Sequence, residues 1–206
     1  MVTQKQLVKS ILAFALLGAV GFGIGGIVGA VIWGSPNTTF TKDGVEYTTR
    51  LGLNPGQIFL SFALIGAVGG TSLGLGLRNW RKAGVLALVG AVSFPTATFI
   101  GAVIQLSLWG SSPPYFAGLF TGAITGIVFG ASLGLALRGW SAAGLLALAG
   151  AIGFSVMFQT TSNLEFEVSS AKSFGIGGAI AGATLGISLS YLARRKVTKE
   201  SSTPEP

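Results

Sequence analysis

Residues 115–137 read YFAGLFTGAITGIVFGASLGLAL, an uncharged run in which every fourth residue from 118 to 134 is glycine. About 20 apolar residues cross the hydrocarbon core of a bilayer as an α-helix, and a helix satisfies its backbone polar groups internally, as lipid requires. The four-residue period places the glycines on one stripe, where a neighbouring helix can approach closely. The run therefore predicts a transmembrane helix that packs through glycine.

Further runs of the same character occupy most of the chain. The six predicted spans are Ile11–Trp33, Gln57–Leu77, Ala83–Leu108, Tyr115–Leu137, Ala142–Gln159 and Phe174–Ala193. Only 9% of the 206 residues are charged and 33 are glycine, whereas soluble chains carry roughly 25% charged residues. We therefore expect an all-α integral membrane protein with one membrane domain, residues 1–194, and a disordered cytoplasmic tail, residues 195–206.

The lysines and arginines gather in alternate loops. If the N-terminus is cytoplasmic, ten of the 13 fall on the inner side, and only Lys42, Arg50 and Lys172 fall outside. Because short cytoplasmic loops are enriched in Lys and Arg, this distribution predicts a multi-pass protein of the bacterial plasma (inner) membrane with both termini in the cytoplasm. It explains the net charge of +7 without nucleic acid. The expected lipid partners are anionic headgroups at the cytoplasmic face.

The first outer loop contains a hairpin signal. Asp43-Gly44 separates two β-prone stretches, Thr39–Thr41 and Val45–Thr49. Asp-Gly between such stretches favours a two-residue turn. We expect a small β-hairpin on the outer surface of the membrane.

The second to fifth spans contain an internal repeat. When the chain is aligned with itself at an offset of 60, 18 of the 29 residues in 66–94 are identical to those in 126–154. Two pairs of rare residues also fall in register: Arg78 with Arg138, and Trp80 with Trp140. We predict two parallel copies of a helical hairpin, residues 57–108 and 115–159, an arrangement that lowers the expectation of an inverted-repeat transporter.

The sixth span resembles the first helix of this unit. The aligned pairs are Gly178 with Gly122, Gly182 with Gly126, Gly186 with Gly130, and Arg194 with Arg138. A ring of three hairpins, the third formed by spans six and one, is therefore an alternative. It stays open because span one matches the second helix of the unit poorly.

The candidate packing residues are the glycines that recur with a four-residue period in four of the spans. They are Gly21, Gly25, Gly29, Gly66, Gly70, Gly74, Gly118, Gly122, Gly126, Gly130, Gly134, Gly178, Gly182 and Gly186. We expect small-xxx-small contacts within the chain; self-association into a homo-oligomer and a narrow pore lined by backbone carbonyls are the alternatives. The spacing is similar to that of the mitochondrial inner-membrane preprotein translocases, which have four spans. That resemblance is limited to the spacing, and it implies no shared function.

Arg78 and Trp80, with their counterparts Arg138 and Trp140, lie at the cytoplasmic ends of the second and fourth spans. Trp prefers the headgroup level and Arg extends to the lipid phosphates, so we interpret them as interface anchors. A specific contact with anionic lipid or a partner protein is the alternative. Within the third span, Pro95 should kink the helix because its ring removes a backbone hydrogen bond.

The residues of common catalytic and metal sites are missing. The chain has no Cys and no His, which removes thiolate and imidazole chemistry. No carboxylate or basic side chain lies within a predicted span, where proton or cation transport usually leaves one. Residues 21–26 have the spacing G-x-G-x-x-G, but a dinucleotide site needs a preceding strand, and Glu165 and Glu167 in an outer loop lack partners for catalysis. We expect no enzyme activity, cofactor or metal.

Two hypotheses for function follow. The first is a structural or assembly subunit of a membrane complex or homo-oligomer, which acts through glycine-mediated helix packing. The second is a channel or facilitator for a small neutral or anionic solute, with Ser, Thr and carbonyl groups lining a path beside Pro95.

Overall fold

The computed structural model describes residues 4–33, 37–42, 45–50, 55–110, 114–137, 139–162 and 169–200. Its helices are α1 (Gln4–Trp33), α2 (Pro55–Gly76), α3 (Trp80–Trp109), α4 (Ala117–Ala136), α5 (Trp140–Ser162) and α6 (Ser169–Glu200). Each contains an apolar segment of 20 to 30 residues, which is long enough to cross a membrane. The predicted six apolar helices are confirmed, and the chain is a multi-pass integral membrane protein.

The terminal helices extend beyond the predicted spans. α1 begins at Gln4, within the polar N-terminal segment, and α6 continues to Glu200. The chain is therefore helical over residues 195–200, where we expected the start of a disordered tail. Arg, Lys and Glu are good helix formers, and no glycine or proline interrupts this segment. Residues 201–206 of the expected tail lie outside the described residues.

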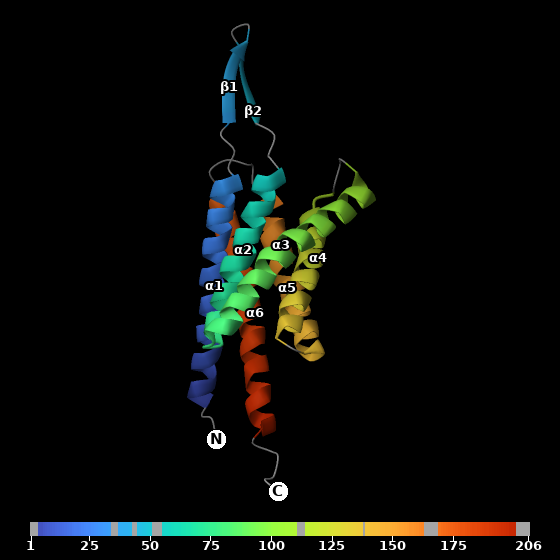
Figure 1. The fold of residues 1–206 in the computed structure, drawn as a ribbon. Helices are drawn as coiled ribbons and strands as arrows, with labels where there is room; N and C mark the ends of the chain where they lie inside the picture. Colours follow the sequence, from blue (N-terminus) through green and yellow to red (C-terminus); the bar gives the residue numbers. More distant parts are fainter. Residues whose placement is uncertain are drawn as a thin grey trace.

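Two short strands follow α1. β1 (Asn37–Lys42) pairs antiparallel with β2 (Val45–Arg50), and Phe40 lies opposite Tyr47. This is the hairpin that the Asp43-Gly44 signal predicts, although the two turn residues themselves lie outside the described part of the chain. The strands form a ribbon that stands beyond the helix ends (Figure 1).

The six helices form a closed ring. Each packs against its neighbours in sequence, and α1 packs against α6. Both chain termini and the α2–α3 and α4–α5 turns lie at one end of the bundle, which we call the termini end (Figure 1). The β-ribbon projects from the opposite end, which we call the ribbon end.

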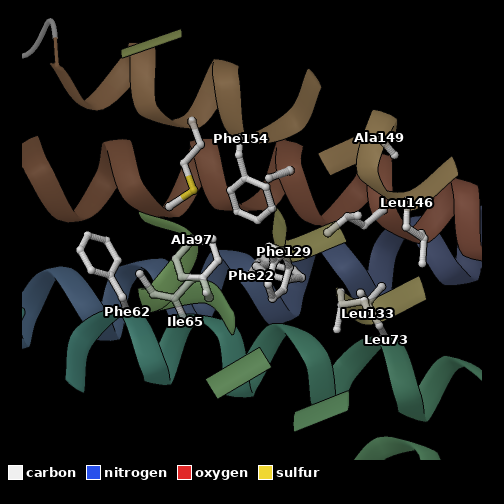
Figure 2. Packing of buried hydrophobic residues seen from close by; sticks show 14 of the residues in the cluster. Phe22, Phe62, Ile65, Leu73, Ala97, Phe129, Leu133, Leu146, Ala149 and Phe154 are labelled. Carbon is white, nitrogen blue, oxygen red and sulfur yellow. The ribbon is translucent and has the colours of Figure 1, made fainter. Parts of the chain in front are cut away.

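Four phenylalanines fill the centre of the ring. Phe22, Phe94, Phe129 and Phe154 come from four different helices and have no exposed surface. Their contacting rings have centroids 5.1 to 5.7 Å apart, mostly in edge-to-face geometry, which aromatic pairs prefer. Figure 2 shows Phe22, Phe129 and Phe154 converging from their helices. At this level the axis of the ring is packed with aromatic side chains.

A tight turn joins α2 to α3. Arg78 adopts a left-handed φ of 52°, and its amide donates to the carbonyl of Leu75 at 2.8 Å. The side-chain oxygen of Asn79 then accepts the amide of Lys82 at 3.1 Å. Asn is a preferred N-cap, so this residue fixes the start of α3 directly after the turn.

Helix α3 changes partner along its length. The helix crosses the bundle obliquely (Figure 1), so that its first half packs on α2 and its second half lies against α4. Proline has no amide hydrogen to donate to the preceding turn of the helix. We call residues 96–109, which follow Pro95, the α3 arm.

Candidate functional site

The glycine stripe of α2 lies against the backbone of α3. At three levels, a methyl group added to an α2 glycine would overlap the main chain of α3. The pairs are Gly66 with Gly90, Gly70 with Leu86, and Gly74 with Ala83. Glycine at these positions therefore lets the two backbones touch, as in other small-xxx-small contacts.

The same contacts recur between α4 and α5. The pairs are Gly122 with Phe154, Gly126 with Gly150, Gly130 with Leu146, and Gly134 with Ala143. Three of these four pairs lie sixty positions after the α2–α3 pairs. The remaining candidate in α4, Gly118, is also buried.

Helices α6 and α1 make contacts of the same kind, although they lie at opposite ends of the chain. The pairs are Gly178 with Phe22, Gly182 with Gly18, and Gly186 with Phe14. When these contacts are aligned with those of the other two helix pairs, α6 corresponds to α2 and α4, and α1 corresponds to α3 and α5. We call this alignment the register of the three helix pairs.

The register also brings out a sequence match that self-alignment missed. Residues 15–22 read ALLGAVGF, residues 87–94 read ALVGAVSF, and residues 147–154 read ALAGAIGF. The match of span one to the second helix of the unit is therefore closer than expected. It lies at an offset of 72 residues, so alignment at the offset of 60 that relates the two hairpins does not reveal it.

Each helix pair also contacts the next pair around the ring. Glycines lie at two of these three contacts, α1–α2 and α5–α6. Gly21, Gly25 and Gly29 of α1 face α2, where a methyl group on Gly25 would lie 3.1 Å from the Cα of Ile65. At the α5–α6 contact, a methyl group on Gly153 would lie 2.6 Å from a backbone atom of α6. The predicted glycine stripes thus face neighbouring helices and not the axis of the ring.

The third contact of this kind, between α3 and α4, is built from polar groups. On α3, Gly101, Gln105 and Trp109 contact α4 at a four-residue spacing. Ser93 corresponds to Gly21 of α1 and Gly153 of α5, each of which faces the next helix of the ring. The hydroxyl of Thr121 in α4 donates to the side-chain oxygen of Gln105. A methyl group on Gly101 would lie 3.4 Å from the hydroxyl oxygen of Thr125.

Two buried hydroxyls, those of Ser93 in α3 and Thr125 in α4, have no hydrogen-bond partner among the described residues. A buried hydroxyl without a partner costs about 1–3 kcal/mol. Hydroxyls at the other two contacts are bonded: Ser72 donates to the carbonyl of Gly69 at 2.8 Å, and Thr184 donates to that of Ala181 at 2.8 Å. The α3–α4 contact is therefore unusual in its unsatisfied polar groups.

The different path of α3 has a local cause. In α5, the Ser155 hydroxyl donates to the carbonyl of Leu119 at 3.0 Å, and the Gln159 side chain accepts the amide of Leu119 at 3.1 Å. These bonds tie the ribbon-end half of α5 to α4. In α3 the corresponding residues are Pro95 and Phe99, whose side chains form no such bond, so the α3 arm is not tied to α2 in this way.

A single stripe holds the α3 arm on α4. At its tip, the ring of Trp109 packs on Phe116 and Phe120 with centroid distances of 5.8 and 5.1 Å. Apart from Ala97 and Thr98, which are 0% and 6% exposed, the rest of the arm faces outward, and Phe99 and Leu106 are 69% and 63% exposed at the surface of the chain.

The described residues among the predicted interface anchors lie at the termini end. Trp80 and Trp140 begin α3 and α5 and are strongly exposed, and Arg78 is exposed in the α2–α3 turn. The other charged candidates lie outside the described residues: Arg138, Glu165 and Glu167. Among the described side chains, no group of three or more His, Cys, Asp or Glu could hold a metal ion.

A closed ring of six apolar helices, packed with aromatic side chains at its centre, defines a multi-span α-helical membrane protein. Comparison of the chain with protein-family models, curated proteins and solved structures found no match.

Proposed function

We propose that this protein is a non-catalytic structural or assembly subunit of a membrane complex, built from repeated helical hairpins whose shape is fixed by glycine packing. The two hairpins α2–α3 and α4–α5 use glycines at equivalent positions to bring their backbones together. Close-packed interiors resist rearrangement, so such a body would present a constant outer surface to a partner.

The α3 arm is the observation that supports this proposal most. The glycine stripes are buried inside the chain, so association with another subunit must use a different surface. The arm touches α4 along one stripe and leaves Phe99, Val103 and Leu106 exposed. We infer that a transmembrane helix of another subunit, in a complex or a homo-oligomer, packs on this face.

Cysteine cross-linking in native membranes tests the assembly role, because the chain has no cysteine of its own. Phe99→Cys and Leu106→Cys should give discrete products larger than the monomer after treatment with a bismaleimide. Matched controls are Leu16→Cys on α1 and Leu148→Cys on α5, which are 65% and 61% exposed. A product of twice the monomer mass would identify a homo-oligomer. Monomer alone in the arm variants would overturn the proposal.

We propose further that the termini end faces the cytoplasm of a bacterial plasma membrane and contacts anionic lipid there. Support comes from Arg78, Arg81 and Lys82, which are exposed beside Trp80 at the start of α3. Basic residues next to the membrane are attracted to anionic headgroups by about 1 kcal/mol each.

A facilitator for a small neutral or anionic solute is the second candidate, and the polar α3–α4 contact favours it. Because phenylalanines fill the axis, a solute path would have to run between these two helices. Flux of glycerol, urea and chloride into liposomes that contain the purified protein tests this role. Liposomes that stay as tight as protein-free ones would overturn it.

A further inference from the structure

We propose that the α3–α4 contact is a binding site for a small uncharged hydrogen-bonding molecule, closed in this structure by the α3 arm. Ser93, Gly101 and Gln105 of α3 form the site with Thr121 and Thr125 of α4. The inference deepens the facilitator candidate and is independent of the assembly role.

The chemistry of the site selects a neutral ligand. Its polar groups are hydroxyls and one carboxamide, and its described residues include no ionisable side chain. A charged ligand would lose its hydration without an opposite charge to replace it. A neutral molecule with several donors and acceptors, such as glycerol or urea, would instead supply the missing partners of Ser93 and Thr125.

The register of the three helix pairs shows that these hydroxyls are not required by the packing. Ser93 corresponds to Gly21 and Gly153. Thr125 corresponds to Ile65 and Ala181. The equivalent contacts thus pack without a hydroxyl at either position, and the α3–α4 contact carries two that lack partners.

The fold allows this contact to open separately from the rest of the ring. The glycine contacts between α2 and α3 lie before the arm, the last of them between Gly66 and Gly90, and Phe62 of α2 meets the ring of Phe94 at 5.9 Å. The arm is held on α4 by the close approach of Gly101 to Thr121, by the hydrogen bond between Thr121 and Gln105, and by the aromatic packing of Trp109. Movement of the arm away from α4 would expose Thr125 and leave the glycine packing between α2 and α3 intact.

Cysteine accessibility tests the site. Purified Thr125→Cys protein in liposomes is treated with a small water-soluble methanethiosulfonate, and the rate of modification is compared with those of Ala181→Cys and Ile65→Cys. All three positions are buried, and they correspond to one another in the ring. We expect Thr125→Cys to react at least about tenfold faster, because only this contact opens locally. Equal rates would overturn the proposal.

The arm has its own test. Gln105→Leu removes the bond to Thr121 and should raise the modification rate of Thr125→Cys severalfold, while that of Ala181→Cys stays unchanged. An unchanged rate at Thr125→Cys would overturn the role of the arm. Thermal unfolding of each variant in detergent confirms that it is folded, so that modification of a misfolded chain is not counted as support.

The ligand class is tested by protection. Glycerol or urea at high concentration should slow the modification of Thr125→Cys and leave the Ala181→Cys control unaffected. If neither solute protects a fast-reacting Thr125→Cys, the assigned ligand class is wrong. If they protect but do not cross the liposome membrane, the facilitator candidate fails and the binding site stands.

Discussion

The backbone of Gly66 in α2 lies directly on the carbonyl of Gly90 in α3, and the contact is reciprocal, so that neither residue has room for a methyl group. Contacts of this kind recur at Gly126 with Gly150 and at Gly182 with Gly18. Each of the three helix pairs thus has one contact with glycine on both sides.

Replacement of Gly66 by alanine should therefore destabilise the protein by about 1–3 kcal/mol, because overpacking forces the two backbones apart. Gly84 provides the matched control, since a methyl group there meets nothing within 4 Å. Gly84→Ala should leave stability unchanged or raise it by up to about 1 kcal/mol through helix propensity. Thermal unfolding in detergent measures both, and equal midpoints for the two variants would contradict the packing role of Gly66.

The aromatic centre should carry much of the stability of the ring. Phe129 contacts three other buried phenylalanine rings, so Phe129→Ala should cost about 3–5 kcal/mol through the cavity that it leaves. Phe99→Ala removes the same side chain from an exposed position on the α3 arm and should change stability by less than about 0.5 kcal/mol in the isolated protein. Denaturation by sodium dodecyl sulfate measures the stability of both variants. Equal losses of stability in the two would show that the centre is not packed in this way.

Gln159 should stabilise the first turn of α4. Its side chain accepts the amide of Leu119 at 3.1 Å and donates to the carbonyl of Tyr115 at 3.0 Å. Gln159→Leu loses both bonds and should cost about 1–2 kcal/mol, with faster hydrogen exchange at the Leu119 amide. Gln57→Leu makes the same change at an exposed position of α2. Unchanged exchange at Leu119 in the Gln159 variant would contradict this role.

Replacement of Arg78 by glycine should raise the stability of the protein, unlike the destabilising substitutions above, because the backbone of Arg78 is left-handed. A non-glycine residue at a φ of 52° is strained, and Arg78→Gly should raise stability by about 0.5–1 kcal/mol. Arg81→Gly removes the same charge at the second residue of α3, where the backbone is already helical, so no strain is relieved and this gain should be absent. A fall in the unfolding midpoint of Arg78→Gly would show that its side-chain contacts outweigh the strain.

Labelling of single cysteines checks the proposed orientation. Arg81 lies at the termini end, and Lys172 lies near the start of α6, at the ribbon end. A membrane-impermeant maleimide should label Lys172→Cys in intact cells, and it should label Arg81→Cys only after the cells are broken. The reverse pattern would place the termini outside the cytoplasm.

The helices and the hairpin can be predicted from the sequence because apolar runs and turn residues are local signals. A continuous apolar run such as residues 115–137 must become a helix in lipid, and Asp43-Gly44 carries its turn preference within two residues. The sequence also singled out the glycines and Pro95. It could not say which surface each glycine faces, because a four-residue period defines a stripe but not its neighbour.

The sequence by itself determined that this chain has six apolar segments long enough to span a membrane and is rich in glycine along them, since apolar length and residue spacing need no partner to be read. Only the tertiary structure decided that α1 pairs with α6, that phenylalanines close the axis, and that the α3 arm rests on α4. The reason is that these contacts join residues far apart in the chain. The course of each helix also depends on which side chains can bond to its neighbour. Ser155 and Gln159 of α5 form hydrogen bonds with α4, whereas their counterparts in α3, Pro95 and Phe99, form no such bonds.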